Sequence, residues 1–183
     1  ERRPLHDIDI EAGVISLGGT VVPLKDAHFP TLDKDSPAAM SDDEWSVIEA
    51  LRDGFVGCTR LSRHMDYLLA NGGMYEFDGR YLMFHGCVPL NDDGSLMGLD
   101  VGGASLMGRP LFNALELQLR KAYSRRYSTQ CQYLSDVAWY LWCGPASPLF
   151  GKEKMTTFER YFVADKQYHR EGKNRYFVER EKP

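Results

Sequence analysis

The sequence predicts an α/β protein of mixed α+β character, in which short antiparallel strands alternate with amphipathic helices. Apolar and polar residues alternate between residues 8 and 24, and Asp78-Gly79 separates two further short apolar runs, as expected for β-hairpins. Elsewhere the apolar residues follow a helical period, as in Trp45, Ile48 and Leu51. A chain of 183 residues that is 43% hydrophobic can form one sizeable core or two small ones.

Residues 1–39 are predicted to form a strand meander followed by a linker. The glycines of Ala12-Gly13 and Gly18-Gly19 interrupt the alternating segment, which indicates two or three short strands. Prolines then recur up to Ala39 in a polar stretch, which is typical of an ordered loop or a linker. We therefore place a domain boundary near residue 39.

Residues 40–73 are predicted to form an inserted helical pair. Ser41 and Glu44 have the spacing of a capping box, so a helix should begin there. Its apolar residues, from Trp45 to Phe55, are expected to face the core. A second helix, with Leu61, Met65, Leu68 and Leu69 facing inward, should cover about residues 60–70 and stop at Asn71-Gly72-Gly73.

Residues 74–183 are predicted to form the third part, with strands first and helices later. Asp78-Gly79 predicts a two-residue turn between strands at 74–77 and 81–84, and the glycine-rich residues 96–106 suggest short irregular strands. Helices are expected from three start signals: Pro110, then Ser135 or Asp136, then Thr156 with Glu159 for a tail helix through residue 172.

Charge and composition exclude several function classes. A net charge of -4 gives the chain no overall attraction for nucleic acid or for an anionic membrane, and no apolar stretch is long enough to span a bilayer. The first residues carry no signal core and no initiator Met, which suggests a processed or excised start. Four scattered cysteines, Cys58, Cys87, Cys131 and Cys143, are expected to be small buried residues with free thiols. A reducing, cytoplasmic location follows.

His85 is the candidate metal ligand among the five histidines. It ends an apolar strand and precedes Gly86, a place where layered α and β folds often carry ligands. A hydrogen-bonded structural histidine explains the same position. The other four, His6, His28, His64 and His169, lie in polar or charged segments and have ordinary surface or hydrogen-bonded roles.

A second candidate site is the loop over residues 141–154, whose tryptophan, glycine and prolines are suited to the rim of a pocket. Lys152, Lys154 and Arg160 are candidate contacts for a phosphate group on a substrate. Interspersed acidic residues also allow a solvated charged surface there.

Several long strings of unusual composition are spread over most of the chain. They are residues 23–30 (PLKDAHFP), 80–90 (RYLMFHGCVPL), 139–145 (WYLWCGP), 147–152 (SPLFGK) and 154–162 (KMTTFERYF). Together these strings resemble class III, Firmicutes-type, fructose-1,6-bisphosphatases, and their length and composition make a chance match improbable.

The resemblance implies a calcineurin-like metallophosphatase, that is, an αββα sandwich, here with a helical insertion. Two divalent metal ions, typically Mn2+, would activate a water that attacks phosphorus, and the substrate would be a sugar phosphate, fructose 1,6-bisphosphate, in gluconeogenesis. His85-Gly86 matches one of the family's metal-ligand motifs, while its Gly-Asp-x-x-Asp and Gly-Asn-His motifs are absent from this chain. We therefore expect an internal fragment that is inactive alone.

Two rival functions remain open at this stage. The first is another sugar-phosphate or phosphoprotein phosphatase of the same fold, because a fold does not fix a substrate. The second is a non-catalytic domain that uses the helical pair for interaction or for assembly into a homo-oligomer. No nucleic-acid or membrane partner is expected in either case.

Overall fold

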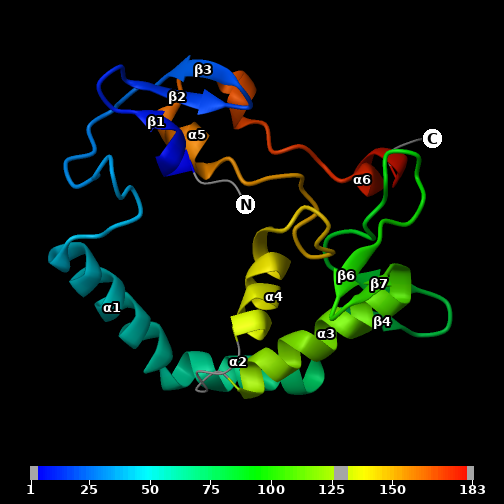
Figure 1. The fold of residues 1–183 in the computed structure, drawn as a ribbon. Coiled ribbons are helices and arrows are strands. Elements are labelled where there is room, and N and C mark those ends of the chain that lie inside the picture. The colour runs from blue at the N-terminus through cyan, green and yellow to red at the C-terminus, as the bar shows by residue number, and fades with distance from the viewer. Residues whose placement is uncertain (1–3, 126–131, 181–183) are drawn as a thin grey trace. The chain divides into compact units, whose positions relative to one another are not determined.

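The structure is a computed structural model that describes residues 4–125 and 132–180. The chain divides into two compact units (Figure 1). The first unit holds residues 4–66 and 156–170, and the second holds residues 67–155 and 171–180 apart from 126–131. Helices and small antiparallel sheets occur together, which confirms the mixed α and β class. The predicted three-part division stays a prediction; the compact units differ from it because residues 156–170 belong with the N-terminal strands.

The first unit is built on the predicted strand meander. A short 3-10 helix, η1 (Pro4–Asp7), leads into a sheet of order β1 (Ile8–Asp9), β2 (Val14–Leu17) and β3 (Thr20–Pro23). Gly18 and Gly19 turn between β2 and β3 with φ angles of 58° and 82°, which favour glycine. Ile15 pairs with Val22, and both are buried against Val163 in the core of this unit.

The returning segment completes that core. Its α5 (Thr157–Phe162) lies beside the meander, and η2 (Lys166–His169) follows it (Figure 1). The amide of Lys25 donates to the carbonyl of Phe162 over 2.7 Å. The predicted start at Thr156 is confirmed, since Thr156 is the N-cap residue of α5, but the helix ends at Phe162 and does not continue to residue 172. Thr156 makes no side-chain cap hydrogen bond; it is buried, and its hydroxyl donates to the carbonyl of His169 over 2.9 Å.

Two consecutive helices, α1 (Asp42–Val56) and α2 (Thr59–Asn71), confirm the predicted helical segments. The capping box is formed, since the amide of Glu44 donates to Ser41 Oγ and the amide of Ser41 donates to the Glu44 carboxylate. The predicted core-facing surfaces are wrong, because neither helix has a buried residue. Nothing in the described residues covers the apolar side of α1.

The second unit begins with a hairpin of β4 (Tyr75–Phe77) and β5 (Leu82–Phe84). Phe77 pairs with Leu82, so the turn contains four residues instead of the predicted two. The longer turn forms because Asp78 Oδ1 accepts hydrogen bonds from the amides of Arg80 and Tyr81, at 2.9 and 2.7 Å. These bonds also lower the pKa of the Asp78 carboxyl.

A second hairpin and three helices complete this unit. The elements are β6 (Leu99–Val101), β7 (Ala104–Leu106), α3 (Gly108–Ser124), α4 (Gln132–Cys143) and α6 (Arg175–Arg180). The predicted helix start at Ser135 or Asp136 is wrong, since both lie inside α4, where Asp136 accepts from the side chain of Gln132. The core of the unit consists of buried residues of α3 with three others: Leu111, Phe112, Leu115, Met74, Val101 and Leu141.

The cysteines only partly follow the prediction. Cys87 is buried and Cys143 is half-buried, whereas Cys58 is exposed, and all three are free thiols. Cys131 lies outside the described residues. None of the helices within residues 4–125 and 132–180 has the length and apolar character needed to cross a membrane.

Candidate functional site

His85 stands immediately after β5 and is exposed on the second unit. It leaves the strand because the next residue, Gly86, has a φ of +85°, a conformation that L-residues with a side chain rarely adopt. An exposed imidazole at the end of a short strand is available to a ligand. Whether this imidazole can act as a rigidly held ligand depends on the contacts that fix the residues next to it.

Gly86 and Cys87 are held against a loop that comes from far along the chain. A Cβ atom added to Gly86 would overlap the carbonyl oxygen of Pro148, so only glycine allows this close approach. The amide of Cys87 donates to the same Pro148 carbonyl over 2.9 Å. The backbone following His85 is therefore fixed on one side by residue 148.

Cys87 supports the backbone next to His85 from within the core. Its side chain is completely buried, with Sγ 3.9 Å from the carbonyl oxygen of Ser147. Burial raises the pKa of the Cys87 thiol to about 11. Without a bound metal, the thiol therefore stays protonated at neutral pH.

Ser147 organises the loop that backs His85. Its buried hydroxyl donates to the carbonyl of Leu141 over 2.7 Å and accepts from the amides of Leu149 and Phe150, at 3.1 and 3.3 Å. One side chain thereby connects the end of α4 to the turn that contains Pro148. The sequence suggested a rigid loop over residues 141–154, and these contacts give the physical reason for that rigidity.

The C-terminal segment closes the other side of this loop. Asn174 is buried, its amide donates to the carbonyl of Gly151 over 3.1 Å, and its Oδ1 accepts from the amide of Leu90 over 3.1 Å. The ring of Tyr176 meets that of Phe84, the last residue of β5, with centroids 5.9 Å apart. Residues on both sides of His85 are thus tied to segments distant in sequence.

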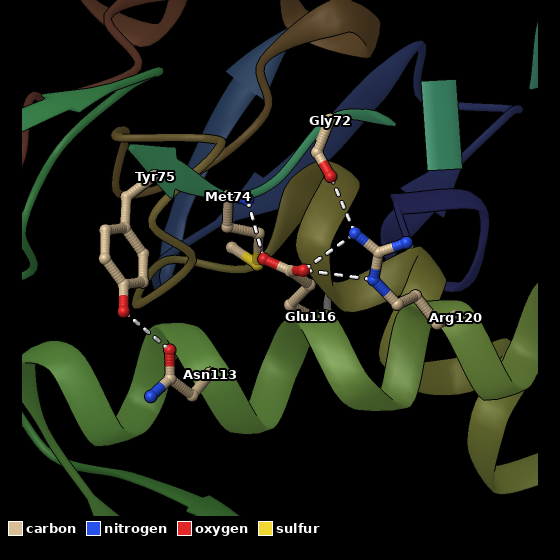
Figure 2. A network of polar contacts seen from close by, with 6 residues as sticks. All are labelled: Gly72, Met74, Tyr75, Asn113, Glu116 and Arg120. Carbon is tan, nitrogen blue, oxygen red and sulfur yellow. Dashed lines mark hydrogen bonds and ion pairs between the residues drawn. The ribbon is translucent and has the colours of Figure 1, made fainter. Parts of the chain in front are cut away.

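A polar clasp fixes the start of the β4–β5 hairpin onto α3. The Glu116 carboxylate accepts from the amide of Met74 over 2.9 Å, and Arg120 donates to that carboxylate over 2.8 Å and to the carbonyl of Gly72 over 2.6 Å. Figure 2 shows both side chains reaching from α3 toward residues 72–74. Burial opposes ionisation of Glu116, but these hydrogen bonds and the Arg120 charge outweigh it and lower the pKa of the carboxyl.

An apolar groove of about 320 Å³ lies along the hairpin. Tyr75, Phe77, Leu82, Phe84, Val88 and Phe112 provide most of its lining. Arg109 is the charged residue at this groove, and its Nε donates to the hydroxyl of Tyr75, which in turn donates to Asn113. The Tyr75–Asn113 bond is also visible in Figure 2. Neither the clasp nor the groove was identified from the sequence.

The three predicted phosphate-binding cations do not lie in one unit. Lys152 and Lys154 belong to the second unit, and Arg160 belongs to the first. Lys152 forms an ion pair with Glu171 over 2.5 Å, and its ammonium lies 5.8 Å from the centre of the Phe150 ring. Lys154 is exposed, and its backbone amide donates to the carbonyl of Glu171.

The described residues do not fit a complete metal centre by themselves. No three histidine, cysteine, aspartate or glutamate side chains within residues 4–125 and 132–180 are grouped so that they could hold a metal ion. Of the other histidines, His6, His28 and His64 are exposed, and the ring of His169 is hydrogen-bonded to the carbonyl of Val163. His85 is thus a candidate for one ligand of a site.

Comparison with known proteins gives a consistent result. A family model described as Firmicute fructose-1,6-bisphosphatase matches residues 1–183. The fructose-1,6-bisphosphatase class 3 of Saccharophagus degradans is 45% identical over 183 residues, which are 100% of this chain and 31% of that protein. The class 3 enzyme of Clostridium botulinum is 43% identical over 178 residues, 97% of this chain and 27% of that protein.

The chain therefore spans about three tenths of the length of the curated relatives it matches. No solved structure matches it significantly.

Proposed function

This chain belongs to the Firmicute fructose-1,6-bisphosphatase family, and we propose that it takes part in hydrolysis of fructose 1,6-bisphosphate to fructose 6-phosphate and phosphate as a portion of a longer polypeptide. The observation that carries the proposal is the 45% identity along the whole chain with a protein of that name. In this role the intact protein is a phosphoric monoester hydrolase of gluconeogenesis in the cytoplasm. The chain alone is inactive.

The fold proposed for the intact protein is the αββα sandwich of calcineurin-like phosphatases. In that reading, β4 and β5 form part of a larger sheet, and α1 with α2 forms an insertion. The exposed β4–β5 hairpin, paired only with itself in the described residues, supports the proposal because a two-stranded sheet has two open edges. A structure of the longer polypeptide in which β4 and β5 remain an isolated pair would contradict it.

We assign to His85 the role of a single metal ligand. Support comes from its exposed position and from the rigid backing given by Gly86, Cys87 and the Ser147 loop. A ligand held by fixed neighbours loses little freedom when it binds, which favours affinity.

The metal proposed for the intact site is Mn2+. Bound divalent ions neutralise phosphate charge and acidify a coordinated water. This chain brings one candidate ligand to such a site, so the remaining ligands would belong to the rest of the intact protein. We derive no catalytic step from the present residues.

Lys152, Lys154 and Arg160 stay proposed contacts for the substrate phosphates. Lys154 is the most direct test, because Lys152 is already paired with Glu171 and would have to leave or share that partner. A Lys154→Ala substitution in the intact enzyme should raise KM for the sugar phosphate with little change in kcat. An unchanged KM would remove Lys154 from the proposal.

The deciding experiment measures phosphate release from fructose 1,6-bisphosphate by the complete polypeptide with added Mn2+. His85→Gln should lower kcat by about 100-fold or more and should reduce the manganese retained after dialysis, as loss of a ligand requires. His64→Gln is the control, because His64 is exposed on α2.

The two readouts separate the parts of the proposal. Full activity and full manganese content in His85→Gln would refute the ligand role and leave the activity standing. A wild-type polypeptide that hydrolyses other phosphate esters but not fructose 1,6-bisphosphate would refute the substrate.

A further inference from the structure

Asn174 is a buried amide side chain that joins backbone segments far apart in the sequence. It is 6% exposed, and both ends of its amide group are hydrogen-bonded. Its Oδ1 accepts from the amides of Leu90 and Tyr176, each over 3.1 Å, and its Nδ2 donates to the carbonyl of Leu90 over 3.4 Å. A buried polar group with satisfied donors and acceptors fixes the backbone that it contacts.

The first segment that Asn174 holds is the one that follows His85. The amide of Cys87 is already bonded to the carbonyl of Pro148 over 2.9 Å. At the other end of the segment, Leu90 has both its amide and its carbonyl bonded to the Asn174 side chain. Residues 87–90 are therefore fixed at both ends, which restricts the backbone that leaves His85.

The residue before His85 is also connected to Asn174. The bond from the amide of Tyr176 to Asn174 Oδ1 fixes Tyr176 at the start of α6. The ring of Tyr176 then meets the ring of Phe84 edge-on, with centroids 5.9 Å apart. On another side Phe84 meets Phe112 of the core, with centroids 6.0 Å apart. Phe84 is thus held between the core and the segment that Asn174 orders.

The third segment is the loop that contains Pro148. The backbone amide of Asn174 donates to the carbonyl of Gly151 over 3.1 Å, and its carbonyl accepts from the amide of Phe177 over 3.0 Å. Phe177 also packs closely on Gly151, since a Cβ atom there would lie 2.8 Å from the Phe177 ring. All three segments that surround His85, residues 84–90, 147–151 and 174–177, therefore meet at Asn174.

We propose that Asn174 is the positioning residue of His85, an inference that rests on the ligand role proposed for His85 above. Asn174 contacts neither His85 nor a substrate; it acts by fixing the backbone before, after and behind the imidazole. One ligand from this chain has to meet ligands from the rest of the polypeptide, so an error in its position weakens the whole site. Loss of Asn174 should therefore impair metal binding more than its effect on stability explains.

The first test measures the Kd for Mn2+ in the complete polypeptide, with free Mn2+ followed by electron paramagnetic resonance. Asn174→Ala should raise this Kd about 10-fold and lower kcat by a similar factor, while KM for the sugar phosphate stays within about 2-fold. Thr156→Val is the control, because Thr156 is equally buried and its hydroxyl is bonded within the first unit. It should lower the midpoint of urea unfolding without changing the Kd.

A double variant tests whether Asn174 acts through His85. His85→Gln alone should weaken Mn2+ binding, and adding Asn174→Ala should change the Kd by no more than about 2-fold, because the group that Asn174 positions is already lost. Tyr176→Leu is a milder variant that keeps the amide bonded to Asn174 and removes only the ring against Phe84. It should raise the Kd about 3-fold, and it carries the test if Asn174→Ala does not fold.

The outcomes separate this inference from the proposed ligand role. Mn2+ binding that is weakened by His85→Gln but unchanged in Tyr176→Leu and in folded Asn174→Ala would overturn the positioning role alone. Losses that add in the double variant, or an equal loss in Thr156→Val, would also overturn it, since Asn174 would then act on general stability. Unchanged Mn2+ binding in His85→Gln would refute the ligand role and the positioning role together.

Discussion

The residues around His85 are held by contacts with distant parts of the chain, whereas the residues of α1 are not. Gly86 and Cys87 are in direct contact with Pro148, and the buried Ser147 and Asn174 form hydrogen bonds to residues of other segments. Helix α1 has strong local signals and no buried residue at all. Long-range contacts therefore make the residues near His85 rigid. Local hydrogen bonds are enough to form helix α1, although none of its side chains is buried.

The largest effect that this comparison predicts is at Gly86. Gly86→Ala should lower the free energy of unfolding by about 3 kcal/mol or more, because the methyl group overlaps the Pro148 carbonyl and the positive φ is strained. Gly79→Ala is a matched control, since its φ is +94° and nothing lies within 4 Å of the added Cβ. That variant should lose only the conformational part, about 1 kcal/mol. Urea unfolding followed by tryptophan fluorescence measures both.

Equal losses in the two glycine variants would mean that backbone conformation alone matters at Gly86. The contact with Pro148 would then have no role in fixing the residues after His85.

Ser147 is expected to have the next largest effect. Ser147→Ala leaves the Leu141 carbonyl and the amides of Leu149 and Phe150 without the partner that the buried hydroxyl provides. Loss of such a buried group costs about 1–3 kcal/mol. Ser16→Ala, at an exposed position on β2, should stay within about 0.5 kcal/mol of wild type in the same unfolding measurement.

Hydrogen exchange of the amides of Leu149 and Phe150 shows where the loss occurs. They should exchange faster in Ser147→Ala while amides of the β1–β3 sheet stay unchanged. Uniform acceleration in both units would argue against a local role for Ser147.

The clasp of Glu116 and Arg120 predicts a smaller and pH-dependent effect. The pKa of the Glu116 carboxyl is lowered from its ordinary value of 4.5 in the folded protein. Its contribution to stability is therefore present above pH 4.5 and is lost as the pH falls through the lower folded value. Glu116→Gln should cost about 1–2 kcal/mol at pH 7, and the difference from wild type should shrink on acidification.

The measurement is urea unfolding at several pH values between 7 and 3. Glu76→Gln, an exposed residue of the same hairpin, serves as the control. If the difference in unfolding free energy between Glu116→Gln and wild type stayed constant down to pH 3, the stabilisation would not come from an ionised Glu116 carboxylate.

Local features of this fold were predictable from the sequence. The capping box of Ser41, the glycine turn at residues 18–19 and the hairpin before His85 depend on residues only a few positions apart. The position of His85 at a strand end was predictable for the same reason. The predicted two-residue turn failed because side-chain bonds to Asp78 favour a longer one.

The support of the site was not predictable, because it depends on pairings across the chain. Glu116 meets the amide of Met74 across 42 positions, and Asn174 meets Leu90 across 84. Nothing near either residue in sequence marks it as a partner. The pattern of α1 identified its apolar side correctly but could not show what that side contacts.

The smallest predicted effect is in α1 itself. Leu51→Ala should change the free energy of unfolding by less than about 0.5 kcal/mol, because Leu51 is 55% exposed and contributes no core packing. Leu115→Ala on α3 removes the same atoms from a side chain that is 1% exposed and should cost about 3 kcal/mol. Urea unfolding of both variants compares the same substitution in the two environments. A loss of about 3 kcal/mol in Leu51→Ala would instead mean that α1 is packed within the chain.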